Sequence, residues 1–173
     1  LGGHSISVEI TVVDDEQLSN NTLSRTVTVL EEIDSGLFSP GSAWRYWDAN
    51  NDPGASWYTN TFDDQAWSVG LGHFGYGDGD ELTATNAGLV SYYFRKKVDL
   101  PDVSQYDELY MQLVHDDAAI VYVNGQEAFR TELIPLGNIN HFTEARQRCN
   151  STNDNAFYTY KINPNLFVDG INT

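Results

Sequence analysis

Three acidic residues in a glycine-rich stretch form a candidate ligand site. They are Asp78, Asp80 and Glu81; Gly77 precedes Asp78, and Gly79 lies between the two aspartates. Glycines at alternate positions allow the backbone to curl, so that the carboxylate oxygens can converge on one point. Ca²⁺ takes about six to eight oxygen ligands, and backbone carbonyls can supply those that side chains do not. The spacing indicates a calcium site unlike an EF-hand loop; the alternative is a solvated acidic turn.

A second acidic pair, Asp116-Asp117, stands between two predicted strands. Aspartate side chains readily accept hydrogen bonds from the backbone of their own turn. We therefore expect this pair mainly to cap a turn, and we keep calcium ligation by Asp116 or Asp117 as the alternative.

Four large aromatic residues with asparagine and aspartate nearby could form a platform for a sugar ring. They are Trp44, Trp47, Trp57 and Tyr58. Aromatic side chains are also the natural filling of a sandwich core, where they bury large apolar areas. Both readings remain open from the sequence, and we expect at most one or two of these rings to be exposed.

The sequence gives no support for catalysis. His4, His73, His115 and His141 lack the spacing of a His-Glu-x-x-His metal site, and neither a Gly-x-Ser-x-Gly elbow nor a Walker loop occurs. Cys149 is the one cysteine, which excludes an internal disulfide and a cysteine-based zinc site. We predict a protein that is not an enzyme.

Charge and composition exclude several partners. The chain has 173 residues with 9 Lys+Arg against 25 Asp+Glu, a net charge of −16. Such a chain cannot neutralise a phosphate backbone, so nucleic acid is excluded as a partner, and so is an anionic membrane surface. Because no apolar run approaches the ~18 residues that span a bilayer, we expect no membrane insertion. An aromatic content of 13% argues for a folded chain rather than disorder.

The composition also bears on location. Two Asn-x-Ser/Thr sequons occur, at Asn20 and Asn150, and lysine is rare beside abundant Asn, Thr, Tyr and Gly. This pattern is typical of a secreted β-protein, so we predict an extracellular or cell-surface location with glycosylation at these two asparagines.

Alternation of apolar and polar residues predicts strands along most of the chain. Asn124-Gly125 between two such runs predicts a type I′ hairpin, and 163–167 reads as a short helical turn. No amphipathic helix of ten residues is convincing, so we predict an all-β sandwich. The predicted strands are 6–12, 23–29, 91–98, 108–114, 119–123, 126–130 and 156–162.

A set of motifs over about residues 44–172 resembles a known family. The motifs are Trp44-x-Tyr46-x-Asp48, Trp57, Phe62-Asp63-Asp64-x-x-Trp67, Gly75-Tyr76-Gly77-Asp78-Gly79-Asp80-Glu81, Tyr93-Phe94-Arg95-Lys96 and Asp116-Asp117-x-x-x-Val121-Tyr122-x-Asn124-Gly125-x-Glu127. Together they resemble the galactose-binding-like jelly-roll modules that accompany phosphoesterase and lamin-tail domains in secreted bacterial proteins. The resemblance implies a jelly-roll β-sandwich.

The order of the last strands differs from that family. The resemblance implies two further strands after the turn near residue 169, whereas residues 6–10 and 18–29 look like those two strands. Three explanations are open: a circular permutation, a hairpin donated to another subunit, or the end of a preceding Ig-like domain in residues 1–32. A sandwich without core strands leaves an apolar groove, and strand addition from a neighbour is one way to fill it.

Donation of the hairpin is our first hypothesis. It divides the chain into a hairpin (1–32), a linker (33–43) and a sandwich body (44–173), and it predicts a homopolymer such as a filament or surface array. The alternative function is a glycan-binding module with calcium, attached to neighbouring domains and bound to polysaccharide. The apolar contacts of donation would come from residues 5–29, through Ile6, Val8, Ile10, Val12, Leu23, Val27 and Val29.

Overall fold

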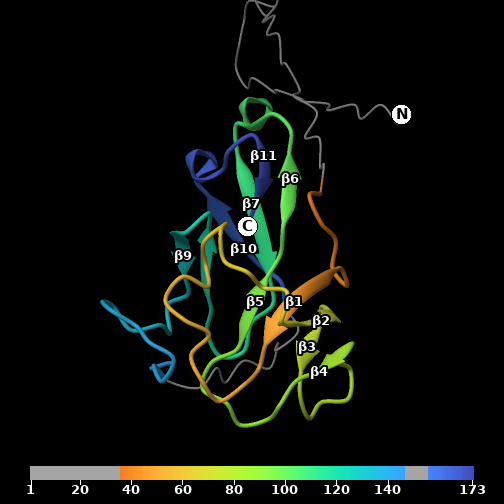
Figure 1. Ribbon diagram of the computed structural model, residues 1–173, viewed down its shortest axis with the longest axis vertical. Helices are drawn as coiled ribbons and strands as arrows, with labels where there is room; N and C mark the ends of the chain where they lie inside the picture. The colour runs from red at the N-terminus through yellow and green to blue at the C-terminus, as the bar shows by residue number, and fades with distance from the viewer. Residues whose placement is uncertain (1–35, 147–155) are drawn as a thin grey trace, which may run out of the picture. The chain divides into compact units, whose positions relative to one another are not determined.

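The described part of the protein consists of short β-strands joined by turns (Figure 1). The computed structural model describes residues 36–146 and 156–173, all of which belong to one unit, Gly36–Thr173. Within these ranges the only helical elements are two 3₁₀ turns, so the predicted all-β class is confirmed. The donor hairpin and the sequons at Asn20 and Asn150 lie outside the described residues.

The strands are two to five residues long and pair mostly with antiparallel neighbours. In chain order they are β1 (Ala43–Trp47), β2 (Ser68–Leu71), β3 (Phe74–Gly75), β4 (Thr83–Ala84), β5 (Tyr93–Arg95), β6 (Val98–Leu100), β7 (Leu109–Leu113), β8 (Ile120–Val123), β9 (Gln126–Arg130), β10 (Tyr158–Ile162) and β11 (Gly170–Asn172), with the 3₁₀ turns η2 (Val103–Gln105) and η3 (Pro164–Leu166).

The widest sheet among these residues is three-stranded, in the order β2-β1-β5. Its central strand, β1, is antiparallel to both neighbours, and Arg45 lies opposite Val69 on one side and Arg95 on the other. Four two-stranded pairs accompany it: β10-β7, β11-β6, β8-β9 and the parallel pair β3-β4. The sheets stay open, and a closed jelly-roll sandwich is not visible among the described residues.

Local sequence signals account for several elements. Asn124 and Gly125 have positive φ angles of 52° and 88°, as the predicted type I′ turn between β8 and β9 requires. The 3₁₀ turn at 164–166 begins after Asn163, whose side chain accepts a hydrogen bond from the backbone N–H of Asn165, with Pro164 in the first position. These two predictions are confirmed.

The run 91–98 is not one strand, as the alternation predicted, but belongs to two. β5 pairs with β1, whereas β6 pairs with β11, so the chain passes from one sheet to another at Lys96-Lys97. Each of the two strands still has one face that points inward, so apolar and polar residues continue to alternate where the chain changes sheet. The pattern therefore cannot show that the two parts of the run pair with different strands.

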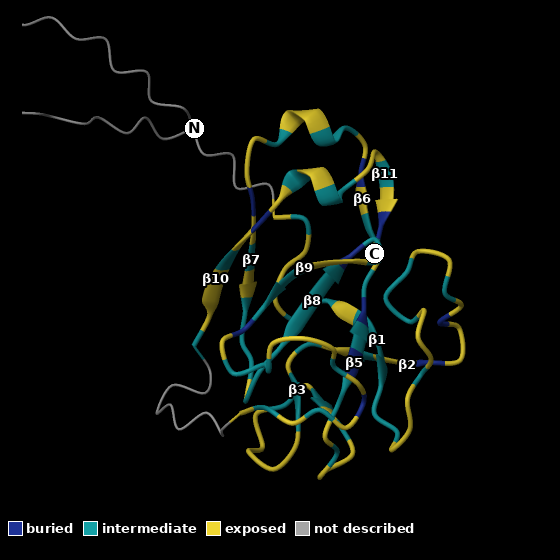
Figure 2. Cartoon of the chain, turned by 90° about the vertical axis from the view of Figure 1, so that its left-hand side faces the viewer, coloured by how far each residue is buried: buried dark blue, intermediate teal, exposed yellow. Residues whose placement is uncertain are grey.

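The core of the body is small. Its buried members are Leu100, Leu109, Val123 and Ile162, one each from β6, β7, β8 and β10. Figure 2 shows these buried segments among larger stretches of intermediate and exposed chain. The partly buried hydrophobic residues around them are Leu37, Val98, Val103, Tyr106, Met111, Ala128, Phe129, Leu166 and Phe167.

Candidate functional site

Each of the four core strands has only one strand partner among the described residues. β6 pairs with β11, β7 with β10, and β8 with β9. Each therefore has a second edge whose backbone groups no described strand pairs. Sheet edges of this kind are templates for an added strand, and proteins usually cover or blunt them.

The apolar side chains near these edges are incompletely covered. Nine hydrophobic residues pack against only four buried ones, so much of the core is in partial contact with solvent in the described structure. Phe129 stacks on Tyr160 with ring centroids 4.3 Å apart, yet neither side chain is buried. The arrangement can accept further apolar side chains, and we call β6, β7, β8 and this partly covered core the open side of the body.

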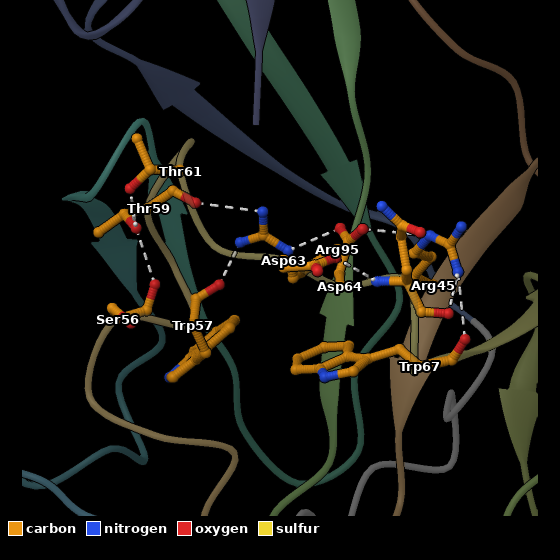
Figure 3. A network of polar contacts seen from close by, with 10 residues as sticks. Arg45, Ser56, Trp57, Thr59, Thr61, Asp63, Asp64, Trp67 and Arg95 are labelled. Carbon is orange, nitrogen blue, oxygen red and sulfur yellow. Dashed lines mark hydrogen bonds and ion pairs between the residues drawn. The ribbon is translucent and has the colours of Figure 1, made fainter.

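A buried ion pair joins segment 56–64 to the three-stranded sheet (Figure 3). Arg95, on β5, places its Nε 3.0 Å from Oδ2 of Asp64, and its side chain is 1% exposed. Its remaining guanidinium nitrogens donate to the backbone carbonyls of Trp57 and Thr59. This one side chain therefore fastens the turn-rich segment 56–64 to the three-stranded sheet.

Arg45 completes this network from β1. Its Nε lies 3.2 Å from Oδ1 of Asp64, and its Nη1 donates to the carbonyl of Trp67 at 3.2 Å. Asp64 thus faces two guanidinium groups that come from paired positions on neighbouring strands. Both groups compensate the charge of one nearly buried carboxylate, which makes the network a structural clamp.

The four residues of the predicted glycan platform are half-buried and contact other aromatic rings. Trp57 meets Tyr58 edge-on at 5.7 Å, and Trp47 lies 6.1 Å from the buried Trp67. Trp44 packs edge-on against Phe38 at 5.4 Å. Most of these rings therefore fill space between segments, and Trp44 also lines a pocket.

The structure brings the three predicted calcium ligands together. Carboxylate oxygens of Asp78, Asp80 and Glu81 lie within 4.8 Å of one another, with both aspartates exposed. The oxygens of Glu81 accept hydrogen bonds from the N–H groups of Asp78 (2.9 Å) and Gly79 (2.8 Å). These backbone bonds hold the pKa of Glu81 below its ordinary value. Three carboxylates suit a hard cation, and calcium binding stays a prediction.

The other predicted acidic pair lies apart from this loop. Asp116 and Asp117 fall between β7 and β8, as expected, with Asp116 exposed and Asp117 partly buried. Among the described residues, the group that could hold a metal ion contains Asp78, Asp80 and Glu81 without this pair. Ligation by Asp116 or Asp117 remains a prediction.

The sequence reasoning missed the roles of Asp64, Arg95 and Arg45. Two of them stand in motifs that carried the family resemblance, but no chemistry was assigned to them. A usable signal was present: in so acidic a chain, the run Arg95-Lys96-Lys97 holds three of nine cations. A cation next to buried aromatic residues indicates a paired arginine, since an unpaired buried charge is costly.

Comparison with known proteins gives no further guide. No family model, no curated protein and no solved structure matches this chain. Within residues 36–146 and 156–173, no helix is long and apolar enough to cross a membrane.

Proposed function

We propose that this chain is a non-enzymatic, extracellular or cell-surface structural subunit that assembles through strand donation. Residues 5–29 of one copy would add to the open side of another copy. One observation supports this most. The strands that have an edge without a described partner also carry the partly covered core. With two strands added, the body would be a jelly roll of the galactose-binding-like class.

The chemistry of the two surfaces is complementary. Residues 6–12 and 23–29 alternate apolar and polar side chains, so each strand would present one apolar face. The open side offers partly exposed Met111 and Phe129 to such a face. Complete burial of one Val or Ile side chain stabilises by about 1.5–3 kcal/mol, so several of them together would hold a subunit firmly. Because donation runs head to tail, repeated addition would produce a filament.

Sedimentation velocity of the full chain over a range of concentrations tests donation. We expect the wild-type chain to form a concentration-dependent series of oligomers. Val8→Asp places a charge on the apolar face and should abolish them, whereas Thr11→Asp, on the other face of the same strand, should leave them intact. Oligomers that survive Val8→Asp would rule donation out. A chain that is monomeric at every concentration would favour permutation or a module within a larger protein.

The second function that we propose is glycan binding, and the position of Trp44 favours it. This indole lines a pocket with a volume of about 360 Å³, together with polar and charged side chains. An aromatic ring beside polar side chains can stack on the apolar face of a sugar while those side chains bind its hydroxyl groups. Retention of a monomeric chain on an immobilised polysaccharide, reduced by Trp44→Ala, would support this function.

A further inference from the structure

The rare positive charges of this chain gather around one pocket. Of nine Lys and Arg residues, four line the pocket beside Trp44, namely Arg45, Arg95, Lys96 and Lys97. The chain as a whole carries a net charge of −16, so this cluster of positive charges has the opposite sign to the net charge of the protein. A concave site lined by one sign of charge concentrates ligands of the opposite sign.

Only part of this charge is compensated within the described structure. Asp64, the acidic residue of the pocket lining, faces both arginines. In the described ranges no carboxylate oxygen lies within 4.0 Å of the ammonium group of Lys96 or Lys97. The lining therefore keeps a surplus of three positive charges.

Several hydrogen-bond donors of the lining are available to a ligand. Each guanidinium nitrogen of Arg95 donates one hydrogen bond within the protein, and its side chain is 1% exposed, so it contributes charge rather than contact. The Arg45 side chain is 35% exposed, and within the described residues its Nη2 donates no hydrogen bond. Lys97 is exposed, and Lys96 uses one of its three N–H groups on the carbonyl of Ala43, at 2.9 Å.

Lys96 is held in a partly desolvated position that favours an anion. Its Nζ lies 5.4 Å from the ring centroid of Phe38 and 5.5 Å from that of Trp44. Burial against these rings lowers the pKa of Lys96. An anionic group beside the ammonium would restore the favourable surroundings that water provides to an exposed lysine.

The apolar part of the lining indicates what carries the anion. The apolar lining residues beside the cations are Ala43, Trp44 and Val69. The pocket volume of about 360 Å³ is larger than an inorganic ion would occupy. A planar guanidinium matches a carboxylate, and an aromatic ring matches the apolar face of a sugar. We infer that the pocket binds the carboxylate of an acidic saccharide, such as a hexuronate, through Arg45, Lys96 and Lys97.

This inference rests on the glycan-binding function and is independent of strand donation. The lining comes from β1, β2, residues 64–65 and residues 95–97, and includes no residue of β7 to β10. Assembly through the open side would therefore leave the chemistry of the pocket unchanged.

Isothermal titration calorimetry of the full chain tests it with three probes: trigalacturonate, maltotriose and inorganic sulfate. We expect trigalacturonate to bind at least tenfold more tightly than either other probe, and more weakly as salt rises. Lys97→Gln should weaken trigalacturonate binding about fivefold or more, since one exposed charge is lost. Lys161→Gln is the matched control, because that exposed lysine pairs with Glu108 and does not line the pocket; it should leave the affinity unchanged.

Each other outcome overturns part of the account. Equal affinity for maltotriose and trigalacturonate would keep glycan binding and refute the acidic saccharide. Sulfate that binds as tightly as trigalacturonate would show an anion site with no role for the sugar. Binding that Lys97→Gln leaves unchanged would place the site elsewhere. If none of the probes binds, both the inference and the glycan-binding function fall.

Discussion

Replacement of Asp64 by alanine is a sharp test of the clamp formed by β1, β5 and segment 56–64. The substitution removes the carboxylate that faces Arg95 and Arg45. With its side chain 1% exposed, Arg95 cannot regain water without local opening. Removal of one partner from a buried ion pair costs about 3–5 kcal/mol. Arg45, being 35% exposed, can rehydrate and should add little to this loss.

Urea unfolding, followed by tryptophan fluorescence, measures this loss. With a slope of about 2 kcal/mol per M for a protein of this size, Asp64→Ala should lower the midpoint by about 2 M. The neighbouring Asp63→Ala is the matched control. Asp63 is exposed and accepts one hydrogen bond, from the N–H of Gln65 at 3.0 Å, so its removal should cost about 1 kcal/mol or less.

A double variant separates the charge from the packing. Asp64→Leu combined with Arg95→Met replaces the buried pair by apolar side chains, which is often neutral or stabilising. We expect this double variant to regain only part of the stability that Asp64→Ala loses, because the carbonyls of Trp57 and Thr59 also lose their donor. If Asp64→Ala moves the midpoint no further than Asp63→Ala does, the clamp does not carry the stability that we assign to it.

Three further predictions concern the rest of the body. Gly70→Ala should destabilise by about 1–3 kcal/mol in urea, because a Cβ there would lie 2.6 Å from the side chain of Thr83; an unchanged midpoint would contradict this packing. The hydrogen bonds from Arg130 hold the pKa of Glu127 below its ordinary value of 4.5, so the stability that the pair provides is present above that pH and is lost as the pH falls through the lowered value. Glu127→Gln should therefore flatten the dependence of the melting temperature on pH between about 5 and 3, and a curve parallel to the wild type would refute it. Calcium at about 100 times its dissociation constant should add about 2.7 kcal/mol, reversibly with EDTA and not in Asp78→Asn; no change in the wild type would remove the calcium site.

Local signals predicted the elements that short-range chemistry determines. The turn at Asn124-Gly125 and strand β9 follow from φ preferences and alternation, and both are observed as expected. The three acidic residues at 78–81 were also expected to converge, because the neighbouring glycines, Gly77 and Gly79, act over a few bonds only. These features depend on neighbours in the chain.

Features that depend on distant partners were not predicted. Arg45 and Arg95 are 50 positions apart and meet at Asp64 only because β1 and β5 pair in one particular register. Strand β11, three residues long, is too short to alternate convincingly, and its pairing with β6 defines it. The pocket combines residues from several segments, so its charge could not be read from any one of them.

The central claim is that a strand from another copy covers the open side of the body. Hydrogen exchange of the full chain, measured at low and high protein concentration, tests this at the backbone amides of β6, β7 and β8. The amides that can report donation are those of the second edges, which do not pair with β11, β10 or β9. We predict slow exchange at these second-edge amides only at concentrations where oligomers form, and fast exchange there in Val8→Asp at any concentration. Slow exchange that is the same at all concentrations, and the same in Val8→Asp, would contradict the claim.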